Sequence, residues 1–185
     1  MSISINDKEY EKLIKRLEFY DTTRNNLLTF SFTAVLTILG AALLKTDVFS
    51  EWFCLIPFCL IIPFAARISY YRLASAHINS FLKQFSPERM QFEIGNDVVG
   101  EDNCRFYRSI AWLVNHEMVL LGLASTMIFY FKVYSTNTGQ CYNCLILSIP
   151  IILTVTVYLI SNSTYSYEDL MKSFGEKWDS YSNGK

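Results

Sequence analysis

The stretch LLTFSFTAVLTILGAALL, residues 27–44, decides the fold class, because it is long, apolar and free of formally charged residues. Three further apolar stretches follow, at Trp52–Ala66, Trp112–Phe131 and Cys144–Ile160. A helix of about 20 mostly apolar residues spans the hydrocarbon core of a bilayer. The sequence therefore predicts an all-α, polytopic membrane protein with four transmembrane helices arranged as two hairpins.

The polar segments between these stretches are expected to carry helices outside the membrane. Asn6-x-x-Glu9 resembles a capping box, and apolar residues then recur at helical spacing up to Tyr20. A second apolar seam runs from Ile68 to Phe85, and Pro87 is expected to end that helix. The predicted segments are a cytoplasmic amphipathic helix (1–25), a first transmembrane hairpin (26–71), a cytoplasmic helix and acidic loop (72–110), a second hairpin (111–161) and a cytoplasmic C-terminal helix (162–185).

Composition and charge limit the function classes. The chain has 185 residues, of which 51% are hydrophobic, so it is too apolar for a disordered protein. Its net charge of −1 gives no overall attraction for nucleic acid, and we expect no direct nucleic-acid partner. All lysines and arginines except Lys45 and Lys132 fall in the segments that we assign to the cytoplasm. The positive-inside rule then predicts a multi-pass membrane protein with both termini cytoplasmic.

A row of threonines follows one face of the first span. Thr29, Thr33 and Thr37 lie one helical turn apart, and Gly40 continues the row. Small and hydroxyl-bearing residues let membrane helices approach closely, so helix packing is one interpretation. The alternative is a polar stripe that lines a water path in an oligomer, because four spans alone barely enclose a pore.

The third span contains Asn115, His116 and Glu117 near its cytoplasmic end. An ionisable residue inside a membrane is costly, and it indicates a functional site by default. One interpretation is a structural ion pair of Glu117 with Arg67 or Arg108. The other is a ring of Glu117 side chains at the inner mouth of an assembled channel, which favours cations, with His116 adding pH sensitivity.

Pro57 and Pro63 in the second span are candidate hinge residues, since proline removes a backbone donor and kinks helices. Packing shape is the simpler explanation for both. Cys141 and Cys144 in the second external loop form either a disulfide or two free thiols. The spacing lacks the two further ligands that zinc needs, so we predict no metal site.

Phe174 and Trp178 lie on one face of the predicted C-terminal helix. They are candidate anchors for a soluble partner, although ordinary core packing is the simpler explanation for both. The chain has no phosphate-binding glycine loop, no nucleophile elbow and no histidine–cysteine cluster. We therefore expect neither enzymatic activity nor a cofactor.

The order of these features resembles that of small four-span membrane components of prokaryotic antiphage systems, such as the membrane subunit of Kiwa-type defence and four-span effectors paired with cyclic-nucleotide signalling. The features concerned are the amphipathic lead-in Tyr10–Tyr20, the span opening NNLLTF at residues 25–30 and the inward continuation Arg67–Phe85. The resemblance implies a homo-oligomer of the bacterial inner membrane that perturbs the membrane or senses its disturbance, with a cytosolic protein or small signal as partner.

These observations favour a non-enzymatic, homo-oligomeric membrane effector or sensor that acts by membrane perturbation or pore opening. Two alternatives stay open at this point. One is a membrane scaffold that docks a soluble cytosolic partner, and the other is a small ion or solute channel. In each case the expected partners are further copies of the chain and membrane lipid.

Overall fold

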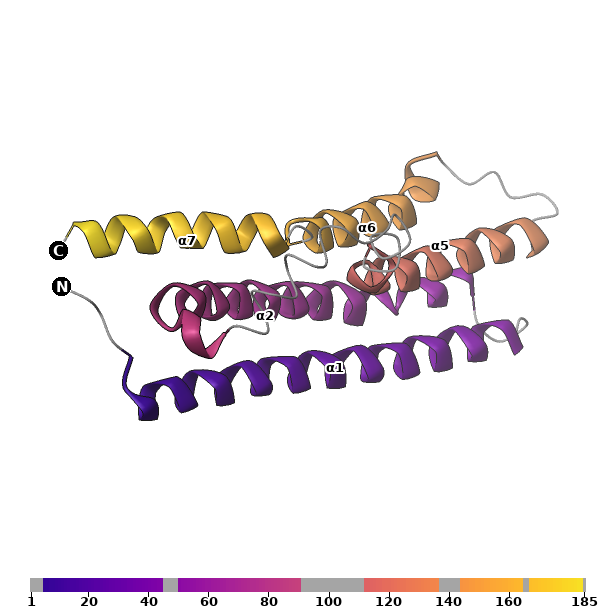
Figure 1. The fold of residues 1–185 in the computed structure, drawn as a ribbon. Coiled ribbons are helices and arrows are strands. Elements are labelled where there is room, and N and C mark those ends of the chain that lie inside the picture. Colours follow the sequence, from indigo (N-terminus) through magenta and orange to yellow (C-terminus); the bar gives the residue numbers. More distant parts are fainter. Residues whose placement is uncertain (1–4, 45–49, 91–111, 137–143, 165–166, 185) are drawn as a thin grey trace. The chain divides into compact units, whose positions relative to one another are not determined.

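The computed structural model describes residues 5–44, 50–90, 112–136, 144–164 and 167–184. Every regular element in these ranges is helical, which confirms the all-α prediction for this part of the chain (Figure 1). The elements in chain order are α1 (Asp7–Leu44), the 3-10 helix η1 (Glu51–Leu55), α2 (Phe58–Phe85), the 3-10 helix η2 (Pro87–Arg89), α5 (Glu117–Thr136), α6 (Cys144–Asn162) and α7 (Tyr167–Asn183).

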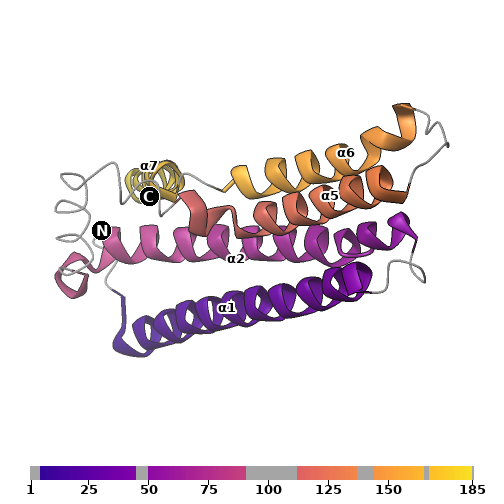
Figure 2. The ribbon, with the colours of Figure 1, turned by 90° about the vertical axis from the view of Figure 1, so that its right-hand side faces the viewer.

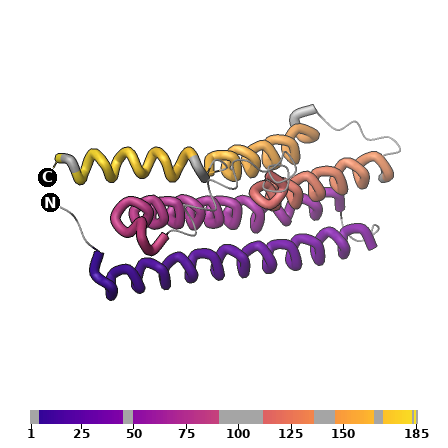
Figure 3. Tube along the Cα trace, viewed as in Figure 1, coloured from indigo at the N-terminus to yellow at the C-terminus, as the bar shows by residue number. Residues whose placement is uncertain are grey.

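Helix α1 is one continuous helix of 38 residues, which Figure 3 traces as an unbroken tube. It begins after Asn6, whose carbonyl accepts hydrogen bonds from the backbone N–H groups of Glu9 and Tyr10, both at 3.0 Å. Acidic Asp7 and Glu9 in its first turn favour the positive end of the helix dipole. At 1.5 Å per residue the helix is about 57 Å long, well beyond the roughly 30 Å of a hydrocarbon core.

Three helical segments are long and apolar enough to cross a membrane, so this is a membrane protein by the length and composition of its helices. They are Asp7–Leu44, Glu51–Phe85 and Glu117–Ser135. The described apolar part of α6, Ile146–Asn162, is shorter than these three. A fourth span and the orientation of the chain therefore belong with the proposals below.

The second predicted span is not one helix. The chain forms η1, turns at Ile56 and Pro57, and only then enters α2. The carbonyl of Pro57 accepts hydrogen bonds from the N–H groups of Leu60 and Ile61, both at 2.9 Å. Because proline has no N–H to leave unsatisfied, the start of a helix accommodates it well. Pro57 thus lies before α2, whereas Pro63 lies inside it.

The third predicted span is also interrupted. Residues 112–115 are helical, His116 forms a turn, and α5 starts at Glu117. The carbonyl of His116 accepts hydrogen bonds from the N–H groups of Val119 at 2.9 Å and Leu120 at 3.1 Å, and these bonds close the first turn of α5. Glu117 is therefore the first residue of a helix and not a residue of its interior.

The chain divides into two compact units. One unit comprises residues 25–69 and 115–163, and we call it the apolar unit. Within it α5 and α6 run antiparallel and side by side (Figures 1 and 2). Gly122 permits a close approach there, since a Cβ at this position would lie 3.3 Å from Phe58 Cε1 and 3.7 Å from Thr154 Oγ1. The hydroxyls of Thr126 and Thr154 are hydrogen-bonded to each other at 2.8 Å, so α5 and α6 are joined by polar as well as apolar contacts.

The other unit comprises residues 1–24, 70–114 and 164–185, and we call it the polar unit. Its described core is built on Ile78, Leu82 and Met90. The apolar face of the N-terminal part of α1 packs against them, with Ile5, Tyr10, Leu13, Ile14, Leu17 and Tyr20. The predicted seam of α2 is confirmed here, because its positions Tyr71, Ile78 and Leu82 are buried. The helix ends at Phe85, just before Pro87, as predicted.

Candidate functional site

The threonine row of α1 lies on the outward face of the apolar unit. Thr29, Thr33 and Thr37 are all exposed. Each Oγ1 donates a hydrogen bond to the carbonyl four residues earlier in α1, at 3.0, 2.9 and 2.7 Å respectively. Each donor is thus satisfied within its own helix, and the face tolerates an apolar surrounding.

A different face of α1 packs into the core of the apolar unit, through Ser31, Val35, Leu39 and Ala42. The threonine row is therefore not part of this buried face. Gly40 extends the outward face, and a Cβ built there meets no atom within 4 Å. The outward face of α1 is defined here by Thr29, Thr33, Thr37 and Gly40.

His116 is fully buried in the apolar unit, and its ring stacks on Tyr158 with the centroids 5.7 Å apart. Asn115 and Glu117 beside it are half-buried. Glu117 occupies the first turn of α5, where a carboxylate is favoured by the helix dipole. Of its two predicted ion-pair partners, Arg67 is exposed on α2 and Arg108 lies outside the described residues. His116 packs as a core aromatic residue of this unit.

Lys132 is the charged residue that sequence reasoning missed. Lys132 directly follows the third apolar stretch, so the sequence predicts that it lies in the connection to the fourth. In the structure it belongs to α5, and only 1% of its surface is exposed. Its Nζ donates a hydrogen bond to the carbonyl of Ala42 at 3.2 Å. Ala42 lies in the last turn of α1, where carbonyls lack helical partners and no basic residue of α1 itself is present. Lys132 therefore supplies the cation that stabilises the C-terminal end of α1.

The candidate docking residues Phe174 and Trp178 pack inside the polar unit. The Trp178 ring stacks on His77 of α2, with centroids 5.2 Å apart and an interplanar angle of 21°. It also meets the edge of Phe81 at 4.9 Å, and Phe174 lies 5.0 Å from His77. Gln84 of α2 donates a hydrogen bond to Asp179 of α7 beside this cluster. These contacts favour core packing as the role of both aromatic residues.

The remaining predicted site residues do not come together. Cys141 lies outside the described residues, as does the side chain of Cys144 at the start of α6. Pro63 is exposed on α2, whereas Pro57 is buried. Among the residues that the structure describes, no group of histidine, cysteine and acidic side chains is arranged to hold a metal ion.

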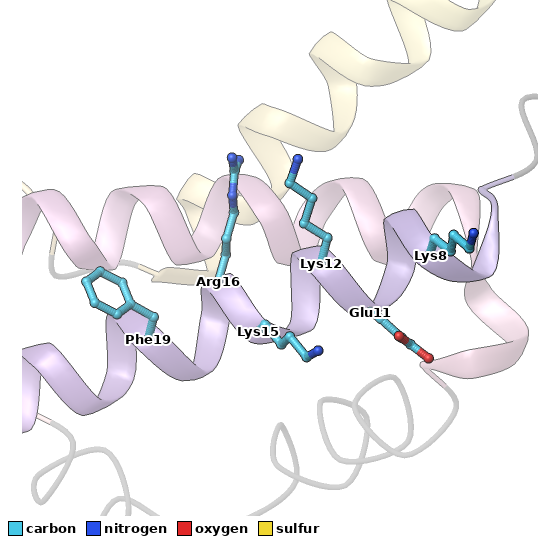
Figure 4. A pocket seen from close by; sticks show the side chains of 6 residues that line it. All are labelled: Lys8, Glu11, Lys12, Lys15, Arg16 and Phe19. Carbon is cyan, nitrogen blue, oxygen red and sulfur yellow. The ribbon is translucent and has the colours of Figure 1, made fainter.

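A shallow hollow lies on the N-terminal part of α1, in the polar unit. It encloses about 360 Å³ and is lined by Lys8, Glu11, Lys12, Lys15, Arg16 and Phe19 (Figure 4). The view shows that all six side chains project from one helix. Four of the six are cations and one is an acid, so the hollow is electropositive. The arrangement suits binding of an anionic group better than catalysis.

Comparison of the chain with protein-family models, with curated proteins and with solved structures found no match.

Proposed function

We propose that this protein is a non-enzymatic, multi-pass membrane protein that associates with further copies of itself. In this proposal α6 is the fourth span, and the chain crosses the membrane as two hairpins with both termini in the cytoplasm. The excess of lysine and arginine in the terminal and central segments supports this orientation. The antiparallel packing of α5 against α6 supports the second hairpin.

The observation that carries the proposal is the outward face of α1. Membrane helices associate through van der Waals packing, and small residues allow their backbones to approach closely. Gly40 has open space beside it, and the three threonines are exposed with their hydroxyls already bonded to their own helix. This face therefore has the chemistry of a helix–helix interface, while the core of its own unit does not use it.

The assembly would act by opening or destabilising the membrane in response to a cytoplasmic partner or signal. The resemblance to antiphage membrane components suggests bacterial defence as the setting and an effector as the role. Glu117 would face the inner mouth of such an assembly and bias it toward cations. The alternative of a small ion or solute channel predicts the same assembly with a constant flux and no trigger.

Co-purification of two differently tagged copies from mild detergent tests the self-association. We expect Thr33→Phe to reduce recovery of the second copy, because a bulky ring blocks the close approach of two α1 helices. Met127→Phe is the matched control, since residue 127 is 70% exposed on α5 and lies outside the outward face of α1. Equal recovery of the second copy in both variants would contradict the proposal.

Liposomes loaded with a self-quenching dye test the membrane activity. Candidate triggers are added to reconstituted protein, and dye release is recorded for the native chain and for Glu117→Gln. We expect triggered release, with altered cation preference in the variant. Vesicles that stay tight with every trigger while the copies still associate would argue for a scaffold instead of an effector.

A further inference from the structure

The N-terminal part of α1 carries a row of cations on the face opposite its buried side. Lys8, Lys12, Lys15 and Phe19 follow one another at steps of four, three and four residues, which places them on one helix face. Arg16 lies next to this row. We call Lys8, Lys12, Lys15, Arg16 and Phe19 the basic face. All five residues are exposed, and Phe19 keeps 59% of its surface accessible.

The charges of the basic face are not balanced within the described part of the polar unit. None of its four cations forms an ion pair or a hydrogen bond with another described residue. Two acids of the same helix segment are paired, Asp7 with Arg89 and Asp21 with Arg24 at 3.6 Å. Glu11 is the one acid in the hollow, so four positive charges face a single negative one.

An exposed phenylalanine among cations that have no described ion-pair partner has the features of a recognition surface. A large apolar side chain at the centre of an interface often supplies much of the binding energy, while surrounding charges steer and orient the partner. Helices that dock into grooves present their anchors at spacings of three and four residues, which is the spacing found here. The structure thus points to an occupant that is acidic and has an apolar recess.

Anionic lipid fits this surface poorly. Glu9, Glu11 and Glu18 lie among the cations of the same helix segment, so a flat anionic lipid surface would meet acids as well as bases. A second copy of the chain fits no better, since a symmetric contact would place cations against cations.

We propose that the basic face of α1 docks a soluble protein that presents an acidic groove with an apolar recess for Phe19. This docking surface is separate from the outward face of α1 that we assign to self-association. It also replaces Phe174 and Trp178 as the site of partner binding, because both are used in packing against α2.

Site-specific photo-crosslinking in the full-length protein tests the proposal. A photoreactive amino acid is placed at position 19, in the membranes of cells that natively contain the protein. We expect one dominant soluble protein in the adduct, joined through a peptide rich in aspartate and glutamate. The double variant Lys12→Glu with Lys15→Glu should lower the yield about tenfold, because it converts attraction into repulsion.

Two matched variants separate loss of charge from loss of fold. Lys12→Arg with Lys15→Arg keeps the charges and should keep the yield. Lys172→Glu reverses an exposed charge on α7 of the same unit and should also keep it. Adducts confined to lipid, nucleic acid or the chain itself would overturn the proposal, and so would a protein adduct that survives the double reversal. Recovery of tagged copies, measured in the same samples, reports self-association independently.

Discussion

Trp178 is predicted to hold α7 on α2 within the polar unit, and its removal should expose α7. The ring touches His77, Phe81, Phe85 and Tyr181 at centroid distances of 5.2, 4.9, 6.2 and 6.1 Å. Truncation of a buried tryptophan to alanine costs about 3 to 5 kcal/mol. Because Trp178 is half-buried, we take the lower end, about 3 kcal/mol, as the expected loss.

Hydrogen exchange measures this loss directly. Each 1.4 kcal/mol corresponds to a tenfold change in an equilibrium constant. The fraction of molecules in which α7 is locally unfolded should therefore rise about 100-fold in Trp178→Ala. The amides of residues 167–183 should lose protection by the same factor. Ser173→Ala, at an exposed position of the same helix, should leave protection nearly unchanged.

A second substitution at the same position sharpens the test. The indole Nε1 of Trp178 is buried and has no acceptor among the residues that the structure describes. An unpaired buried donor costs about 1 to 3 kcal/mol. Trp178→Phe removes this donor while it keeps much of the ring, so the two effects should offset each other to within about 1 kcal/mol. Equal protection of α7 in native and Trp178→Ala protein would refute the reasoning, because the cluster would then not hold the helix.

Three further substitutions test the apolar unit, each by thermal unfolding in detergent. Lys132→Glu should lower the free energy of unfolding by about 3 kcal/mol or more, because it places a buried carboxylate against the Ala42 carbonyl. Lys132→Arg should lower it less, and equal stability of the two variants would be inconsistent with a buried cation. Thr126→Val should cost about 0.6 to 1 kcal/mol through the lost contact between α5 and α6, while Thr156→Val, whose hydroxyl bonds only its own helix in the described contacts, should cost less. Gly122→Leu should cost about 1 to 3 kcal/mol by overpacking, and an unchanged melting temperature would show that the helices separate readily there.

The positions of the helices follow from local properties of the sequence. Long apolar stretches predict α1 and α5, and the seam from Ile68 to Phe85 predicts the buried face of α2 in the polar unit. Such patterns depend on residues close in sequence, so a single chain is sufficient to read them. The starts of α2 and α5 do not follow from hydropathy. Pro57 and His116 each lie immediately before a helix, although both fall within stretches that are apolar enough to be predicted as continuous spans.

The tertiary structure decided which face of each helix is used. Thr33 and Val35 are neighbours in an equally apolar stretch, yet Thr33 is exposed and Val35 is buried. Lys132 looks like a loop residue until its Nζ is seen on the carbonyl of Ala42, 90 residues away in the chain. The sequence leaves Trp178 either as an anchor for a partner or as a core residue, and the ring of His77 stacked on it favours the core. Hydropathy alone determined that these helices are apolar enough for a bilayer. Contacts between residues distant in sequence decided which side chains remain available for partners, because the burial of a helix face depends on the segments that pack against it.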